Sequence, residues 1–173
     1  MTPLELVLKA RLPRCLSDVD TTAIDPPEPR ECTVTAFSLS RKSSDDAIAQ
    51  VFGYSLADYN PSCESDPGFI GPITLRWMDG AQSCVFDSDI HGYHGEMHSS
   101  TKFRGEGPAK AFECNKCGHD HFRLTVQFDY GDACDDLLED GVDLPVQGYF
   151  RNILFLGGCA ICGNVNRILD MDL

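Results

Sequence analysis

Residues 112–128 read "FECNKCGHDHFRLTVQF", in which a C-x-x-C-G motif runs directly into an alternating apolar stretch. From Phe122 onward every second residue is apolar, through Leu124, Val126 and Phe128. A period of two is typical of a β-strand with one buried face. The cysteine pair ahead of the strand is a candidate metal-binding turn. This stretch therefore predicts a strand that carries half of a metal site at its start.

A second C-x-x-C-G motif, Cys159–Gly163, follows another strand-like stretch, "YFRNILFLGG" at 149–158. A tetrahedral zinc ion needs four thiolate or imidazole donors, and one C-x-x-C turn supplies two of them. The glycine after each pair permits the positive φ that such a turn requires. Two turns, each beside a strand, therefore predict one metal site whose ligands are Cys114, Cys117, Cys159 and Cys162.

These two motifs and their flanking strands resemble a zinc ribbon or, more broadly, the rubredoxin-like group of two-knuckle folds. The resemblance runs from residue 111 to about residue 169, which places it in the C-terminal third of the chain. It implies one structural Zn²⁺ per chain at the four cysteines. The chain departs from the pattern in the 41 residues between Cys117 and Cys159. Segment 129–143, with seven acidic residues and no basic ones, is the natural candidate for an insertion.

The same cysteines leave two alternatives open. Iron suits a four-sulfur site and would imply electron transfer, as in rubredoxins. Each C-x-x-C pair could instead be a redox dithiol, although neither pair opens a predicted helix that would lower a thiol pKa. A four-cysteine site has no open position for water, so its expected role is structural. His119 and His121 are then surplus ligands or solvated polar residues at the entry to the strand.

The N-terminal part of the chain has mixed helix and strand patterns. Apolar spacing predicts a helix over 4–12, which Pro13 ends, and a second over 43–59, where Ser and Asp stand at the expected N-cap. Residues 32–40, "CTVTAFSLS", predict a strand. We therefore expect an α+β fold with a small antiparallel sheet and one or two short helices.

A turn signal and a chain boundary complete the predicted organisation. Asp79-Gly80 lies between two strand-like stretches and predicts a β-hairpin at 72–86 with a two-residue type I′ turn. Pro108 and the glycines just before it indicate a boundary. The predicted domains are an α+β region over 1–108 and a zinc-ribbon β module over 109–173.

The chain has nine cysteines, an odd number, and its N-terminus lacks the pattern of a secretory signal. This combination predicts a reducing compartment, and we expect the protein in the cytoplasm. Cys32 and Cys84 lie in strand-like surroundings, where a cysteine acts as a small buried hydrophobe. The sequence assigns no role to the five cysteines outside the motifs, which are Cys15, Cys32, Cys63, Cys84 and Cys134.

A second site is a weaker hypothesis. On an extended backbone His94, Glu96 and His98 would share one face, and two imidazoles with a carboxylate can form a catalytic zinc or iron site. The glycines nearby favour a solvated loop instead. Cys63 is a conceivable nucleophile, but the acidic residues beside it would raise its pKa. Segment 129–143 lacks the ligand order of a calcium-binding EF-hand loop.

The charge balance narrows the classes of partner. The net charge is −13, and residues 111–173 hold four basic residues against eleven acidic ones. Such a field disfavours nucleic acid and anionic membranes and favours a protein with a basic surface. We predict an acidic zinc-binding protein that acts by protein–protein binding, in its sharpest form an immunity or antitoxin-type inhibitor that masks a basic active site. The alternatives are a metal-dependent enzyme that uses His94, Glu96 and His98, and a transcription or RNA accessory protein.

Overall fold

The computed structural model of the chain describes residues 16–28, 34–59, 62, 67–87, 105–130, 136, 139–141 and 150–172. This part of the chain forms nine strands in one sheet and one short helix, α2 (Leu56–Tyr59). The strands are β1 (Val19–Ile24), β2 (Val34–Arg41), β3 (Ile48–Ser55), β4 (Phe69–Trp77), β5 (Gln82–Phe86), β6 (Lys110–Ala111), β7 (Phe122–Tyr130), β8 (Phe150–Cys159) and β9 (Val165–Asp172).

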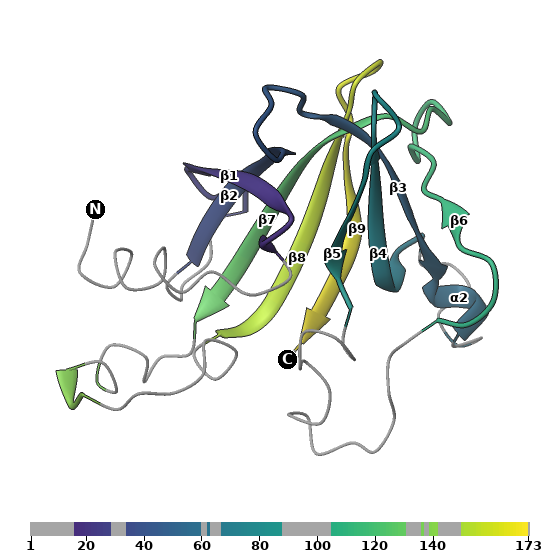
Figure 1. Cartoon of the computed structure of the whole chain (residues 1–173). Coiled ribbons are helices and arrows are strands. Elements are labelled where there is room, and N and C mark those ends of the chain that lie inside the picture. The colour runs from purple at the N-terminus through teal and green to yellow at the C-terminus, as the bar shows by residue number, and fades with distance from the viewer. Residues whose placement is uncertain are drawn as a thin grey trace.

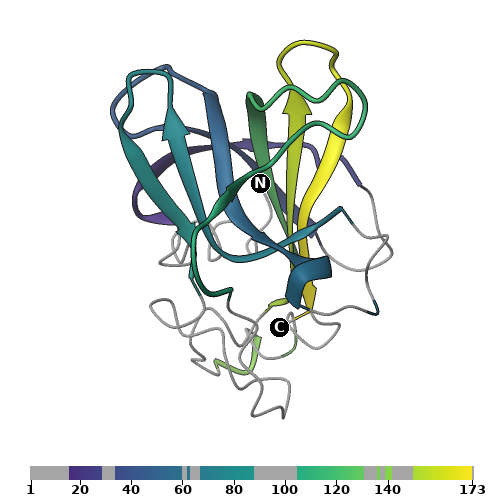
Figure 2. The ribbon, with the colours of Figure 1, turned by 90° about the vertical axis from the view of Figure 1, so that its right-hand side faces the viewer.

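Strand β7 organises the sheet, in which every pairing is antiparallel. One edge of β7 pairs with β8 along its whole length, and β8 pairs in turn with β9. The other edge is divided, because β2 pairs with residues 125–129 and β3 pairs with residues 122–123. Strand β1 extends the sheet from β2, while β4 and β5 extend it from β3. The result is a curled half-barrel, in which β3–β4–β5 and β7–β8–β9 form two facing walls (Figures 1 and 2).

The core lies inside this curl. The inward positions of β7 are Phe122, Leu124, Val126 and Phe128, and all four side chains are buried. Phe112, which precedes the first cysteine pair, contacts Phe122 edge-on with ring centroids 5.6 Å apart. Its ring also meets that of Phe69 on β4 at 5.0 Å. These aromatic contacts fix the short segment before the first C-x-x-C motif against both walls.

The prediction of an α+β fold is wrong. Within the described residues helix α2 has four residues, and no helix is long and apolar enough to cross a membrane. The middle of the helix predicted over 43–59 is strand β3, whose buried residues alternate as Ala49, Val51 and Gly53, and only the last four residues of that range, α2, are helical. The strands predicted to form a separate ribbon module belong to the same sheet as β2 and β3. The helix predicted over 4–12 lies outside the described residues.

The residues before β3 show why the helix prediction failed. The Asp46 carboxylate accepts the Ile48 backbone N–H at 3.2 Å, so it caps a turn that leads into a strand. Apolar residues at 47, 48, 51 and 52 fit helical spacing, but Ile48, Val51 and Phe52 are β-branched or aromatic and favour a strand. Pairing with β4 and β7 on opposite edges then decides the outcome.

Strands β4 and β5 are joined by residues 78–81, which form a three-residue hairpin loop (78–80) closed by Ala81 opposite Trp77, and not the two-residue type I′ turn. Gly80 donates its N–H to the Trp77 carbonyl at 2.9 Å, and Trp77 donates to the Ala81 carbonyl at 2.9 Å. Gly80 has a φ of 87°. A turn followed by one glycine in the left-handed region is the usual three-residue hairpin loop.

Candidate metal centre

The two C-x-x-C-G motifs fold into the same turn. In the first, Gly118 donates its N–H to the Cys114 carbonyl at 2.9 Å, and Cys114 donates to the His119 carbonyl at 2.7 Å. In the second, Gly163 donates to the Cys159 carbonyl and Cys159 to the Asn164 carbonyl, both at 2.9 Å. The φ angles of Gly118 and Gly163 are 78° and 74°. Each motif therefore forms a knuckle with the same hydrogen bonds and the same glycine conformation.

The sheet brings the two knuckles to one end of the half-barrel. The first knuckle (residues 114–118) lies between β6 and β7, and the second (residues 159–163) joins β8 to β9. Phe122, at the start of β7, pairs directly with Cys159, at the end of β8. The pairing continues beyond the strands, because the Ala160 N–H donates to the His121 carbonyl at 2.9 Å. Long-range strand register thus aligns two motifs that lie far apart in the sequence.

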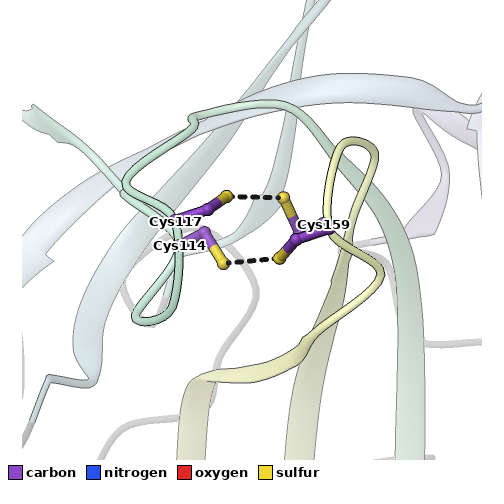
Figure 3. A group of neighbouring side chains, drawn as sticks. Cys114, Cys117 and Cys159 are labelled. Carbon is purple, nitrogen blue, oxygen red and sulfur yellow. Dashed lines mark hydrogen bonds between the residues drawn. The ribbon is translucent and has the colours of Figure 1, made fainter.

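The four cysteine sulfurs converge between the knuckles (Figure 3). All four Sγ atoms lie within 4.8 Å of one another. Two contacts join the knuckles, with 3.6 Å between the sulfurs of Cys114 and Cys162 and 3.5 Å between those of Cys117 and Cys159. Four sulfurs bound at about 2.3 Å to one tetrahedral ion lie about 3.8 Å apart, so the cluster matches a four-thiolate centre. Cys114 precedes the C-terminal third of the chain, so the centre is not confined to that third.

The cysteines differ in burial. Cys114 and Cys159 are each 4% exposed, Cys162 is partly buried and Cys117 is exposed. The first cysteine of each knuckle therefore faces the protein interior. The second cysteine of the first knuckle faces solvent.

The surroundings of the sulfurs also give the cysteine thiols different pKa values. Burial would raise the pKa of Cys114, but the backbone amides of Cys117 and Lys116 and the Asn166 side chain lower it to about 6. The backbone amide of Cys162 lowers the pKa of Cys159. The His119 amide would lower the pKa of Cys117, but partial desolvation and the neighbouring sulfurs raise it to about 12. Two sulfurs thus favour the thiolate form, and a neighbouring thiol retains its proton.

Asn166 is a part of the centre that the sequence analysis missed. It lies on β9, three residues after the second knuckle, and its side chain is buried. Its Nδ2 lies 3.6 Å from the Cys114 sulfur, within hydrogen-bonding distance for sulfur. Its Oδ1 accepts the Asn115 N–H at 2.9 Å. The only signal in the sequence is a polar residue at an inward position of a strand.

Among the described residues, the other candidates are not part of the cysteine cluster. His119 and His121 lie beside the cysteines in the chain, yet the ligand cluster found in the described residues contains cysteines alone. The His121 Nδ1 lies 2.8 Å from Asp120, and the Asp120 carboxylate also accepts the Gln50 amide at 2.7 Å. Cys84 is partly buried in β5. The remaining candidates, His94, Glu96, His98, Cys15, Cys32, Cys63 and Cys134, lie outside the described residues, as does most of the 129–143 segment.

The likeness to a zinc ribbon is carried by the knuckle geometry alone. No protein-family model, curated protein or solved structure matches this chain. The described residues around the four cysteines nevertheless contain the hydrogen bonds and the sulfur spacing that a four-thiolate metal centre needs.

Proposed function

We propose that the protein binds one Zn²⁺ ion through Cys114, Cys117, Cys159 and Cys162, and that this ion has a structural role. The observation that carries the proposal is the convergence of four sulfurs from two matching knuckles. A four-thiolate zinc ion has no open position for water or substrate. Its bonds would join the segment before β7 to the β8–β9 hairpin and so stabilise one end of the half-barrel.

The test of the metal is its identity and stoichiometry. We expect native mass spectrometry and elemental analysis of protein purified without chelator to give one zinc per chain. The double substitution of Cys159 and Cys162 by Ser should abolish binding, whereas Cys84→Ser, in β5 and outside the cluster, should retain it. One iron per chain would replace this proposal with an electron-transfer role.

We further propose that the protein acts by binding a protein partner with a basic surface. The support is the distribution of charge on the described surface, together with a net charge of −13. Arg41 already lies 3.0 Å from the Asp79 carboxylate, and Lys110 lies 2.6 Å from that of Asp58. Arg167 contacts both Asp170 and Glu28. Cations paired in this way leave an acidic excess that would steer a basic partner towards the protein.

An immunity or antitoxin-type inhibitor is the specific form of this proposal, because a basic active site is a complementary target. The test is affinity capture on the immobilised zinc-loaded protein at low and high salt, followed by mass spectrometry. We expect basic proteins to be retained at low salt and released at high salt. Retention of acidic proteins, or retention that salt does not change, would contradict the proposal. The Cys159/Cys162 double variant controls for dependence on the folded metal centre.

A further inference from the structure

Asn166 contacts the first knuckle and the residues that flank the second from a single buried position. Its side chain is 1% exposed, and its Nδ2 lies 3.2 Å from the Gly157 carbonyl oxygen and 3.1 Å from that of Asn164. The same nitrogen lies 3.6 Å from the Cys114 sulfur, so two N–H groups serve three acceptors. The side-chain oxygen accepts the Asn115 N–H at 2.9 Å.

The chemistry of these partners fixes the orientation of the amide. The carbonyls of Gly157 and Asn164 can only accept hydrogen bonds, and the N–H of Asn115 can only donate one. A flipped amide would place its oxygen against both carbonyls and its NH₂ group against the Asn115 N–H. Nδ2 is therefore the atom that faces the Cys114 sulfur.

These contacts break the symmetry between the knuckles. Asn115 and Cys114 belong to the first knuckle, whereas Gly157 and Asn164 flank the second. The side chain of Asn166 thus links the two knuckles without using the metal. Asn166 and Cys114 are buried, whereas Cys117 is exposed, so this link lies on the buried side of the cluster.

We propose that Asn166 is a positioning residue of the metal centre: it donates to the Cys114 sulfur and holds the two knuckles together, so that the bound metal is retained. The inference rests on the proposed four-cysteine metal site. Hydrogen-bond donors of this kind orient metal ligands, and their loss costs about 10- to 100-fold in metal affinity.

The first experiment compares Asn166→Ala with Asn164→Ala. Asn164 lies in the same turn, and the carbonyl that Asn166 uses remains in its alanine variant. Its side chain makes only a 3.4 Å contact with Asn166. Chelator competition should show zinc affinity lowered by about 10- to 100-fold in Asn166→Ala and nearly unchanged in Asn164→Ala. Equal affinities in the two variants and the unaltered chain would overturn the inference while leaving the metal site in place.

A second readout separates donation to sulfur from packing. In the Co²⁺-substituted protein, loss of an N–H donor makes the thiolate a stronger electron donor, so the sulfur-to-cobalt charge-transfer band should move to lower energy in Asn166→Ala. Asn166→Asp keeps the size of the side chain but places an anion beside the sulfur and two carbonyls. It should therefore lower metal affinity at least as much as Asn166→Ala. An unshifted band, or an Asn166→Asp protein with unchanged affinity, would overturn the proposed donation.

A measurement on the unaltered chain covers the case in which these variants do not fold. In the ¹¹³Cd-loaded protein, a ¹H–¹¹³Cd correlation should connect the metal to the Asn166 side-chain amide through the Cys114 sulfur. Its absence, with correlations to the knuckle backbone amides present, would overturn the inference. A chain that binds no metal at all would instead refute the proposed function.

Discussion

The two knuckles have the same backbone and different surroundings. Both make the same pair of hydrogen bonds, and both end in a glycine of positive φ. The second knuckle joins the long paired strands β8 and β9. The first knuckle follows β6, a strand of only two residues, and precedes β7. In the first knuckle the second ligand, Cys117, is exposed, whereas its counterpart in the second knuckle, Cys162, is partly buried. The short motif therefore determines the turn, and the sheet determines the environment of each sulfur.

The largest expected effect is that removal of the metal makes the two knuckles differ in the stability of their backbone hydrogen bonds. In the metal-free chain we expect the Gly118 amide to exchange with solvent about tenfold faster than the Gly163 amide. The reason is that the paired strands β8 and β9 still hold the second knuckle. Hydrogen–deuterium exchange with mass spectrometry on the loaded and stripped chains measures this difference. Equal loss of protection in both knuckles would show that the hairpin alone does not maintain the second turn.

Truncation of Phe112 tests the packing beneath the first knuckle. Its buried ring contacts Phe69 and Phe122, so Phe112→Ala should lower the free energy of unfolding by about 3–5 kcal/mol. Urea unfolding of the metal-loaded protein gives the value. Phe52→Ala, at a partly exposed ring beneath Arg76, is the control and should cost clearly less. A cost for Phe112→Ala no larger than that control would contradict the packing role.

The two glycines test whether the knuckles are energetically alike. An alanine at Gly118 or Gly163 would have nothing within 4 Å of its Cβ, so only the positive φ opposes it. Each substitution should lower the free energy of unfolding by about 1–2 kcal/mol, and by similar amounts. Gly158→Ala is the matched control, because its Cβ would meet only a carbonyl oxygen at 3.8 Å. A markedly unequal cost would mean that the knuckles differ in backbone strain.

The smallest expected effect is in the protons released by metal binding. The pKa of Cys117, about 12, means that this thiol is protonated at neutral pH and would release its proton to solvent when the metal binds. Cys114, with a pKa of about 6, is already a thiolate and releases little. Metal affinity should therefore decrease as the pH is lowered, and more steeply below about pH 6, where Cys114 also becomes protonated. Calorimetry in buffers of different ionisation enthalpy measures the number of protons released at each pH. If metal affinity does not fall more steeply below about pH 6, the low pKa assigned to Cys114 is contradicted.

The features that the sequence predicted are the local ones. A C-x-x-C-G motif determines its own turn, and the period of two in β7 reports its buried face directly. Strand β3 was predicted as a helix because residues 47, 48, 51 and 52 fit helical spacing, and its partner β7 lies far away in the chain. The local signal for Asn166, a polar residue at an inward strand position, does not reveal its contacts. Its role exists only once β9 has paired with β8 beside the first knuckle.

The divided edge of β7 has a consequence for how the chain is made. Strands β2 and β3 are synthesised well before β7, the strand that pairs with both of them. Two of the four sulfurs, those of Cys159 and Cys162, come later still. The edges of β2 and β3 that pair with β7 therefore stay without this partner until β7 has been made, and contacts of such long sequence separation form slowly. The four cysteines can converge only after Cys162 has been made, so completion of the proposed metal centre follows the synthesis of β2, β3 and β7.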